Sequence, residues 1–339
     1  MDSPRDRFLS ALQGRRTERA PLAYVAALTN VDIQKQTGCF MPEAHLDGAK
    51  LFRLCAAAHE VLRFDAVTFL INAFYEPAAL GCDMDWGTME FLPTYRSHPW
   101  RAPEDARIPP DLLSRQPIQT YLDSLKRAKR SYGERVAVVG KVLGPLTLVQ
   151  VMHGVERTMI GLIDDPDKIR RFLIPAVEVA SICANAQFDE GIDAVSIGEG
   201  GAGANMLSPE MYEGILQEFH QRLISKIRGP TVMHICGDIT PRLDSLKRVG
   251  FDCFNFDWAI PPRAMREKSE GRFSLMGNIN TTDLHLGTPA EIERQVAENL
   301  EAGVDIISPG CAVSPLCPTE NLLALASGID KWYQSRRSG

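Results

Sequence analysis

A histidine and two cysteines of this chain have the residue types and the spacing of a metal site. His234 and Cys236 lie two residues apart at the end of an apolar run, and Cys311 follows a second apolar run 75 residues after Cys236. In an extended strand, residues two apart point to the same face, so an imidazole nitrogen and a sulfur would meet at one point. If Cys311 reaches that point from another strand end, a fourth position stays open, which is typical of a catalytic zinc and not of a structural one.

The same three residues have a simpler interpretation, in which they are only packed or hydrogen bonded near strand ends. His234 and Cys236 alone do not decide between the two. A third soft ligand at a strand end on the same face favours the metal. Cys317 is an alternative third ligand, but it precedes Pro318 at an expected helix start, so we interpret it as a neighbour of the helix cap.

The segments that must position these ligands alternate between short β-branched apolar runs and longer helical patterns. This alternation predicts parallel strands covered by helices. Eight runs fit strands, at residues 22–27, 66–70, 137–142, 194–198, 231–235, 253–257, 274–277 and 305–308. Eight strands that alternate with helices predict a (β/α)8 barrel, the TIM-barrel fold.

Helix signals and one irregular region complete the predicted architecture. Ser3 and Pro4 predict the start of an N-terminal helix, and residues 288–291 have the pattern of a capping box. Residues 81–117 are rich in proline and aromatic residues with weak periodicity, which indicates an insertion after the second strand. No internal repeat or linker divides the chain, so residues 1–339 are expected to form a single domain.

The barrel places the candidate ligands together, because catalytic groups of such folds sit at the carboxyl ends of the strands. His234 and Cys236 end the fifth run and Asp257 ends the sixth. Asn278 follows the seventh run and Cys311 follows the eighth. All five residues are therefore expected at one mouth of the barrel.

The composition is that of an ordinary soluble globular protein, with 339 residues of which 45% are hydrophobic and 24% charged. A net charge of −6 without a block of Lys and Arg argues against nucleic acid or an anionic membrane surface as a partner. The charged beginning of the chain and the lack of an apolar run of about 20 residues argue against a secretory signal and a membrane span. We therefore expect a cytoplasmic protein whose eight cysteines are reduced.

Five segments of the chain carry a family resemblance: His234-Ile235-Cys236-Gly237-Asp238, Phe256-Asp257-Trp258, Gly277-Asn278-Ile279, Ile306 to Cys311 and Pro318 to Asn321. Together they resemble the uroporphyrinogen decarboxylase superfamily, specifically its methylcobamide:coenzyme M methyltransferase branch. Members of that branch carry a methyl group from a methylated corrinoid protein to an acceptor thiol, typically coenzyme M, and use zinc held by a histidine and two cysteines. For this chain the resemblance implies zinc on His234, Cys236 and Cys311.

The resemblance also implies a methylated corrinoid (methylcobalamin) as the methyl donor. The chain has no corrinoid-ligating segment of the Asp-x-His-x-x-Gly type, so the corrinoid is expected on a partner protein. A zinc-bound thiol is deprotonated, whereas a free thiol at neutral pH is mostly protonated. The acceptor sulfur would attack the methyl carbon on cobalt(III) and leave cobalt(I). The protein is expected to be a monomer or a homodimer.

Further residues are candidates for catalysis or for binding the acceptor. Asp257 would serve as a weak fourth zinc ligand in the resting enzyme or as the hydrogen-bond acceptor that orients His234, unless it is only a carboxylate satisfied by backbone. Glu76 is a candidate base, and the remaining candidates for acceptor contacts are Asn72, Tyr75, Glu199 and Asn278. The glycines after Glu199 permit either the close approach of a ligand or a tight turn.

Three other functions remain open. Tetrahydrofolate is an alternative acceptor to the thiol, because acceptor selectivity depends on pocket shape. Decarboxylation of uroporphyrinogen is disfavoured, since residues 24–30 contain no arginine for its carboxylates and a decarboxylase has no use for the three metal ligands. A non-catalytic protein that handles a metal or a corrinoid would have a zinc site closed by a fourth protein ligand.

Overall fold

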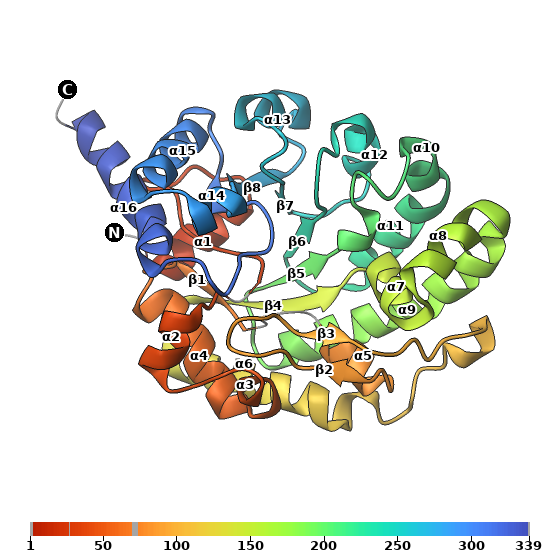
Figure 1. Cartoon of the computed structure of the whole chain (residues 1–339). Helices are drawn as coiled ribbons and strands as arrows, with labels where there is room; N and C mark the ends of the chain where they lie inside the picture. Colours follow the sequence, from red (N-terminus) through yellow and green to blue (C-terminus); the bar gives the residue numbers. More distant parts are fainter. Residues whose placement is uncertain (1–2, 27, 70–73, 338–339) are drawn as a thin grey trace.

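Seven parallel strands form the sheet at the centre of the molecule. The structure, a computed structural model, describes residues 3–26, 28–69 and 74–337 (Figure 1). In the order of their hydrogen bonding, the strands are β1 (Ala66–Thr68), β4 (Ala137–Leu143), β5 (Ala194–Gly198), β6 (Thr231–His234), β7 (Cys253–Asn255), β8 (Ser274–Ile279) and β9 (Ile306–Pro309). Nearly all of their residues are buried, which explains why the strands have continuous apolar sequences.

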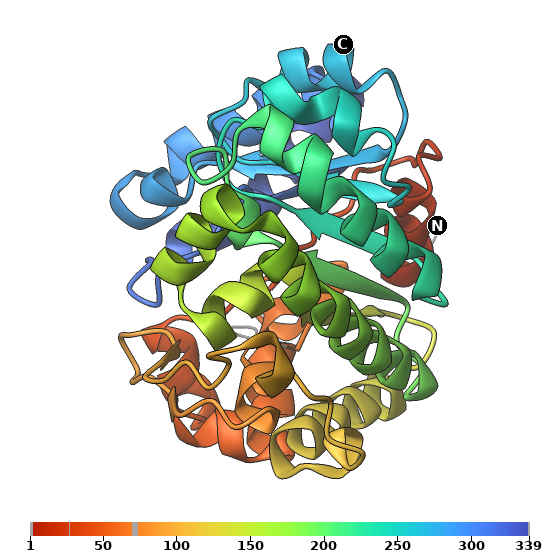
Figure 2. The same ribbon diagram turned by 90° about the vertical axis from the view of Figure 1, so that its right-hand side faces the viewer.

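Helices connect successive strands and cover the outer face of the sheet, as parallel connections require. Figure 2 shows α9 and α11 lying outside the strands. The helices are α1 (Pro4–Leu12), α2 (Val31–Thr37), α3 (Glu43–Leu46), α4 (Gly48–Glu60), α5 (Tyr75–Ala79), α6 (Gln116–Tyr132), α7 (Pro145–His153), α8 (Val155–Asp164), α9 (Pro166–Asp189), α10 (Pro209–Met211), α11 (Gln217–Lys226), α12 (Leu243–Leu246), α13 (Pro262–Ser269), α14 (Thr281–Leu286), α15 (Pro289–Glu301) and α16 (Thr319–Arg337). The predicted cap at Ser3 and the capping box of Thr288 with Glu291 both form.

A short piece of the N-terminal segment fills the eighth strand position. Leu22 forms an isolated parallel bridge with Ile307 of β9. On the other side, the amide of Asp65, next to β1, donates a hydrogen bond to the Leu22 carbonyl (2.8 Å). These contacts join the two edges of the sheet and close it into a TIM-barrel-like α/β fold.

The predicted strand 22–27 is wrong beyond this bridge. The carbonyl of Tyr24 accepts a hydrogen bond from the hydroxyl of Thr68 (2.6 Å), and the carbonyl of Val25 accepts one from the hydroxyl of Ser196 (2.7 Å). Because side chains of β1 and β5 replace a backbone ladder, the chain leaves the strand direction and contributes to a cavity wall at the barrel mouth. Residue 27 lies outside the described residues.

Helix α1 closes the amino end of the barrel. Its residues Phe8, Ala11 and Leu12 are buried, and the helix contacts β1, β4, β8 and β9. The hydroxyl of Ser274, at the start of β8, donates a hydrogen bond to the Leu12 carbonyl (2.9 Å). The predicted N-terminal helix is thus confirmed, and it covers the end of the barrel opposite to the candidate ligands.

The region between β1 and β4 contains little regular structure before α6, as the sequence predicts. It holds a small antiparallel hairpin, β2 (Met84–Asp85) with β3 (Thr94–Tyr95), and two short 3-10 helices, Pro103–Asp105 and Leu112–Ser114. Leu92, between the two hairpin strands, lines the cavity described below. Among the helices that the structure describes, none combines the length and apolar character needed to cross a membrane.

Candidate metal centre and adjoining cavity

The three predicted ligands meet at the carboxyl ends of β6 and β9. Nε2 of His234 lies 3.3 Å from the sulfur of Cys236, which lies 3.5 Å from the sulfur of Cys311. All three ligand atoms are within 4.8 Å of one another. Ligands held about 2.0 to 2.3 Å from one tetrahedral zinc ion lie roughly 3.3 to 3.8 Å apart. The donor atoms and their spacing therefore fit a zinc ion.

The imidazole of His234 is oriented by the backbone of the next strand. Its Nδ1 lies 3.2 Å from the carbonyl oxygen of Asn255, which can only accept a hydrogen bond. Nδ1 must therefore carry the proton, and in the neutral ring Nε2 keeps the free lone pair that a metal requires. This arrangement corrects one expectation, because Asn255 and not Asp257 is the acceptor that orients His234.

The two cysteines differ in their ease of ionisation. The hydrogen bond between them lowers the pKa of Cys311, although burial opposes this shift. The same hydrogen bond raises the pKa of Cys236, and burial adds to this effect. A contact that favours the ionised form of one of the two thiols suits a cation site, because a thiol must lose its proton to bind a metal.

The carboxylate of Asp257 is held by backbone amides beside the metal ligands. Its Oδ2 accepts a hydrogen bond from Gly237 (3.0 Å), and its Oδ1 accepts one from Ala259 (2.9 Å). Its negative charge contributes to the raised pKa of Cys236. Asp257 thus fixes the loop after Cys236, and its carboxylate is not among the atoms that cluster around the candidate metal position.

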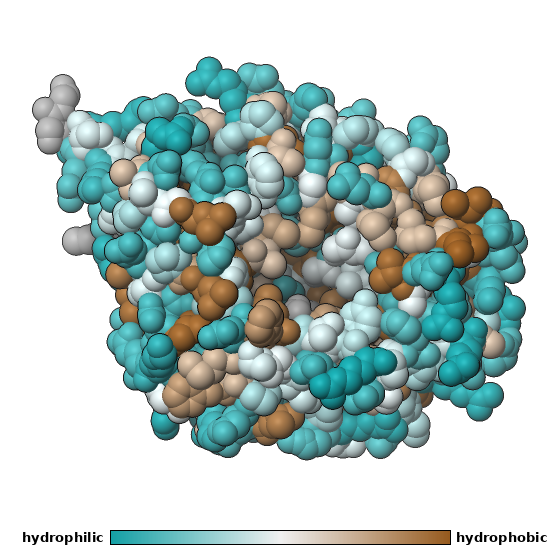
Figure 3. Space-filling view, in the orientation of Figure 1, coloured by the Kyte–Doolittle hydropathy of each residue, from teal (hydrophilic) through white to brown (hydrophobic). Residues whose placement is uncertain are grey.

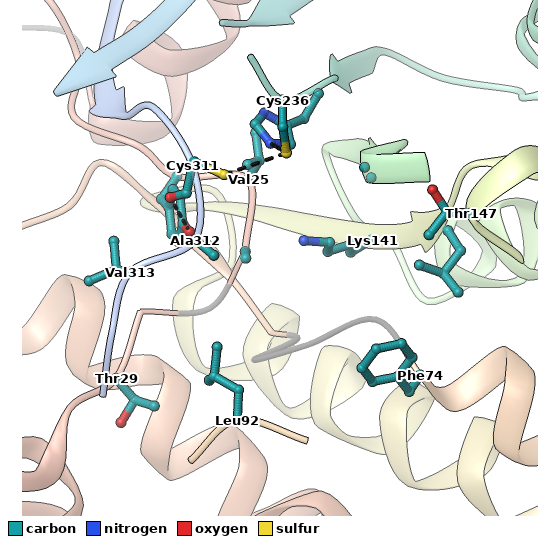
Figure 4. A pocket seen from close by; sticks show the side chains of 16 residues that line it. Val25, Thr29, Phe74, Leu92, Lys141, Thr147, Cys236, Cys311, Ala312 and Val313 are labelled. Carbon is teal, nitrogen blue, oxygen red and sulfur yellow. Dashed lines mark hydrogen bonds between the residues drawn. The ribbon is translucent and has the colours of Figure 1, made fainter. Parts of the chain in front are cut away.

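A cavity of about 220 Å³ opens beside the sulfurs. Figure 4 shows Phe74, Leu92, Val313 and Ala312 around it, with the two cysteines at one end. The N-terminal segment contributes Tyr24, Val25, Ala26 and Thr29. The walls are mostly apolar, which favours a ligand with a short apolar body and few polar groups.

Lys141 places a cation in this cavity. The residue belongs to β4, and Figure 4 shows its side chain crossing the cavity with its nitrogen directed toward the side of Ala312. Burial lowers the pKa of the ammonium to about 8, although the charges of Cys236, Cys311 and Glu76 oppose this shift. The ammonium therefore remains mainly protonated at neutral pH.

Glu76 and Tyr75, expected as base and acceptor contact, lie behind the cavity wall. Burial raises the pKa of Glu76 to about 7, and its carboxylate accepts a hydrogen bond from the amide of Leu143 (3.3 Å). Tyr75 stacks on Tyr121, and its hydroxyl donates to the carbonyl of His45 (3.0 Å). Neither expectation holds, because α5 directs both side chains into the core. Tyr75 and Glu76 therefore support the cavity wall from behind and do not contact its space.

Glu199, expected at the acceptor, is fully buried beneath the loop that follows β5. Its carboxylate accepts hydrogen bonds from the amides of Leu146 and Thr147 at the start of α7 and from the Thr147 hydroxyl. His220 of α11 contacts the other side of the same carboxylate (3.0 Å). This corrects the expectation, because the carboxylate is used to cap α7 and not to line the cavity.

The glycines after Glu199 allow the loop to approach α7 closely. A Cβ atom at Gly201 would lie 2.5 Å from the side-chain oxygen of Gln150, and the Gly201 amide donates to the Thr147 hydroxyl (2.9 Å). A Cβ at Gly144 would collide with the carboxylate of Glu199. The segment therefore combines tight packing at Gly201 with open space at Gly200, which lines the cavity and where an added Cβ would have no neighbour within 4 Å.

Asn278 also supports the site from outside the cavity. Its side-chain amide donates to the carbonyls of Asp257 (3.1 Å) and Ile260 (2.7 Å), which ties β8 to the loop after β7. The expected contact with the acceptor is corrected accordingly. Asn72, the remaining predicted contact, lies outside the described residues.

The sequence interpretation missed Lys141, Phe74 and Leu92. A signal existed for Lys141, since it is a charge inside a run that otherwise fits a buried strand, and charged residues are rarely buried without a purpose. Phe74 and Leu92 carry no such signal. They reach the cavity only because the segments after β1 fold back over the barrel mouth.

Comparisons with known proteins agree with this architecture. A family model described as uroporphyrinogen decarboxylase (URO-D) matches residues 3–332. A methylcobamide:CoM methyltransferase, MtaA, of Methanosarcina barkeri is 29% identical over 330 residues, which are 96% of this chain and 97% of the relative. A methylated-thiol:coenzyme M methyltransferase of Methanosarcina mazei is 28% identical, over 95% of this chain and 88% of the relative. The solved structure of a methyltransferase from Methanosarcina mazei superimposes with a TM-score of 0.95 at 29% identity, covering 98% of this chain and 100% of that one.

Proposed function

The chain belongs to the uroporphyrinogen decarboxylase family, and within it we propose that the protein is a zinc-dependent methyltransferase that moves a methyl group from a methylated corrinoid protein to an acceptor thiol such as coenzyme M. The observation that carries this proposal is the meeting of His234, Cys236 and Cys311 at the mouth of a small cavity. The names of the similar methyltransferases support the same reaction class.

The donor set supports zinc, because one neutral imidazole and two ionisable thiols are the ligands that zinc prefers in catalytic sites. A zinc ion held there would keep the acceptor sulfur as a thiolate at neutral pH. His234 is fixed by the Asn255 carbonyl, and the loop that carries Cys236 is fixed by Asp257. The chain thus holds its ligands rigidly and leaves the cavity side open for the acceptor.

In the proposed reaction the acceptor sulfur forms a new bond to the methyl carbon. The bond between carbon and cobalt breaks at the same time, and both of its electrons remain on the metal, so cobalt(III) becomes cobalt(I). The thiol proton is released to solvent before the transfer. The apolar walls of the cavity exclude water from the reacting sulfur, which strengthens the attack of a thiolate on carbon.

The methyl donor must approach from outside, because a corrin macrocycle is larger than a cavity of about 220 Å³. Figure 3 shows a central hollow with apolar side chains gathered around it. Two exposed apolar residues, Phe91 next to the cavity-lining Leu92 and Trp258 next to Asp257, are placed beside the mouth and are called the apolar rim. Such a rim supports docking of a corrinoid-carrying protein over the mouth.

Decarboxylation of a porphyrinogen fits the cavity poorly. A substrate with many carboxylates needs several cations and a large pocket, whereas Lys141 is the one charged residue among the described side chains that line the cavity besides the metal ligands. The volume of about 220 Å³ also suits a much smaller molecule.

The direct test mixes the zinc-loaded protein with methylcobalamin and one candidate acceptor at a time. Cobalt(I) is followed by its absorption, and the methylated product is identified by mass spectrometry. We expect transfer to a thiol, and none in a Cys311→Ala protein. Transfer to tetrahydrofolate and to no thiol would replace the proposed acceptor class, and absence of any transfer would overturn the proposal.

A further inference from the structure

One arginine near the candidate metal centre is buried without an anionic partner. Arg242 ends the 3-10 helix Thr240–Arg242, six residues after Cys236, and only 3% of its surface is exposed. Among the residues that the structure describes, no carboxylate forms a salt bridge with it, and its guanidinium lies 5.7 Å from the centre of the Tyr212 ring. A buried charge of this kind is costly unless its donors are used.

The donors of this guanidinium are used on three backbone carbonyls in the loop between β5 and α10. Nη1 donates to the carbonyl of Ala202 (2.6 Å). Nη2 donates to the carbonyls of Gly203 (3.2 Å) and Leu207 (3.1 Å). All three residues are buried and lie outside the strands, so the guanidinium supplies donors that a sheet would supply elsewhere. Arg242 thereby fixes both ends of residues 202–207 to the segment that follows Cys236.

Residues 202–207 in turn contact the backbone of a candidate metal ligand. The amide of Ala204 donates to the carbonyl of Cys236 (3.0 Å). Close packing accompanies this hydrogen bond, since a Cβ atom at Gly203 would lie 3.6 Å from the carbonyl oxygen of Cys236. A Cβ atom at Gly237 would lie 3.0 Å from the Cβ of Ala204. The position of the Cys236 backbone is therefore coupled to that of residues 202–207.

The beginning of the same loop has a separate anchor. The amide of Gly201 donates to the Thr147 hydroxyl (2.9 Å), and its carbonyl accepts a hydrogen bond from the side chain of Gln150 (3.1 Å). Both partners belong to α7. Within the described part of the chain, Arg242 is the one side chain that donates to the carbonyls of residues 202–207. The half of the loop that contacts Cys236 therefore depends on Arg242.

We propose that Arg242 is a positioning residue for the metal centre, which holds Cys236 in place through residues 202–207. This inference rests on the proposed function, because it assumes that Cys236 is a zinc ligand. Partners outside the ligand set commonly control metal affinity by fixing the direction of a ligand. Arg242 acts on the carbonyl of Cys236, whereas Asp257 accepts a hydrogen bond from the amide of the next residue, Gly237 (3.0 Å).

Zinc affinity tests this positioning without any methyl transfer. We expect Arg242→Met to weaken zinc binding by at least about 10-fold in competition with a fluorescent chelator. Arg242→Lys keeps the charge but lacks the planar fork that reaches several carbonyls at once, so it should recover only part of the affinity. Wild-type affinity in Arg242→Met would overturn the inference.

Arg266→Met is the matched control. Arg266 also donates to a backbone carbonyl, that of Gly303, and it pairs with Asp305, which precedes β9 at the barrel end opposite to the ligands. We expect this variant to lose stability to thermal unfolding and to keep the zinc affinity of the wild type. A loss of zinc affinity as large as that of Arg242→Met would assign both effects to stability and overturn the positioning role.

Hydrogen exchange and cobalt substitution follow the link itself. In the metal-free protein, peptides that contain residues 202–207 should exchange at least about 10-fold faster in Arg242→Met, because the amide of Ala204 loses its fixed acceptor. Cobalt(II) in place of zinc reports the direction of the Cys236 sulfur through its thiolate-to-metal absorption, which should change in the variant. A folded Arg242→Met protein with the exchange and the cobalt spectrum of the wild type would overturn the inference even if it were less stable. If Arg242→Met does not fold, Arg242→Lys is measured in the same ways, and wild-type values throughout would overturn the inference.

The results also separate this inference from the proposed function. Methyl transfer by the wild-type protein, together with unchanged zinc affinity in Arg242→Met, would support the reaction and overturn the positioning role. Weaker zinc binding in Arg242→Met, together with no methyl transfer by the wild-type protein, would overturn the reaction and support the positioning role.

Discussion

The hydroxyl of Tyr24 donates a hydrogen bond to the backbone carbonyl of Cys311 over a distance of 2.8 Å. The two residues are 287 positions apart in the sequence. Burial raises the pKa of Tyr24 above its ordinary value, so the phenol stays protonated and remains a donor. The segment that leaves the barrel after Ala23 thereby holds the backbone of a candidate metal ligand.

We expect Tyr24→Phe to weaken zinc binding by about 10-fold, because a lost contact to the backbone of a ligand loosens its orientation. Competition with a chromophoric chelator measures the affinity. Tyr333→Phe removes a hydroxyl that accepts a hydrogen bond from Ala20 elsewhere in the molecule, and it should leave zinc affinity unchanged. Equal losses in both variants would show that the effect is one of general stability.

Removal of either cysteine should abolish tight zinc binding. Cys236→Ala and Cys311→Ala are expected to contain much less than one zinc per chain by metal analysis, whereas Cys317→Ala should keep its zinc. The sulfur of Cys317 is buried and donates to the carbonyl of Leu284 (2.8 Å), away from the other two sulfurs. Full zinc in both single variants would contradict the ligand assignment.

Glu199→Ala should destabilise the protein by about 3 kcal/mol and leave the affinity for the acceptor unchanged. The reason is that the substitution leaves the amides of Leu146 and Thr147 without their buried acceptor and His220 without its partner. Urea unfolding gives the change in free energy, and thiol titration of the folded protein gives the affinity. A large loss of thiol affinity at unchanged stability would restore Glu199 as a substrate contact.

Glu76→Gln should stabilise the protein in a pH-dependent manner. Burial raises the pKa of Glu76 from 4.5 to about 7, so the folded state keeps the proton after the unfolded state has lost it. The destabilisation by the wild-type carboxyl therefore grows as the pH rises from 4.5 to about 7 and is constant above that range. The stability difference between the variant and the wild type should follow this curve up to about 3 kcal/mol. Urea unfolding at a series of pH values measures it, and a difference that is independent of pH would contradict the prediction.

Phe91→Glu should reduce kcat/KM with a protein-bound methylcorrinoid by about 10-fold, because this exposed phenylalanine belongs to the apolar rim and is next to Leu92, which lines the cavity. The rate with free methylcobalamin should not change. Ile174→Glu on the outer helix α9 is the matched control, since it adds the same charge away from the rim. A loss with free methylcobalamin as well would point to damage of the site and not of the docking surface.

The strands and the meeting of the three candidate ligands were predictable because both follow short-range rules. The alternation of apolar runs and helices indicates the barrel, and the spacing of two residues in a strand brings His234 and Cys236 to one face. Cys311 could be added because all parallel strands end at the same mouth.

The contacts around the ligands follow no such rule. A position at the end of a strand predicts that a residue lies at the barrel mouth. It does not predict the direction of the side chain. The carboxylate of Glu199 points inward, where it accepts hydrogen bonds from the amides of residues 146 and 147, which are 53 and 52 positions away in the sequence. It also contacts His220 on another helix. Tyr75 turns into the core because Tyr121 offers a ring to stack on. These partners depend on tertiary packing, so no local pattern in the sequence indicates them.

The cavity is lined by two separate parts of the chain, the ends of the barrel strands and the segments that connect them. Its candidate metal ligands come from the ends of β6 and β9, whereas Phe74 and Leu92 come from the segments that connect β1 to β4. Substitutions in those connecting segments can reshape the space offered to the acceptor without moving a ligand. If the proposed reaction holds, the fold therefore allows new acceptors to be acquired in evolution while the chemistry at the sulfurs is inherited unchanged.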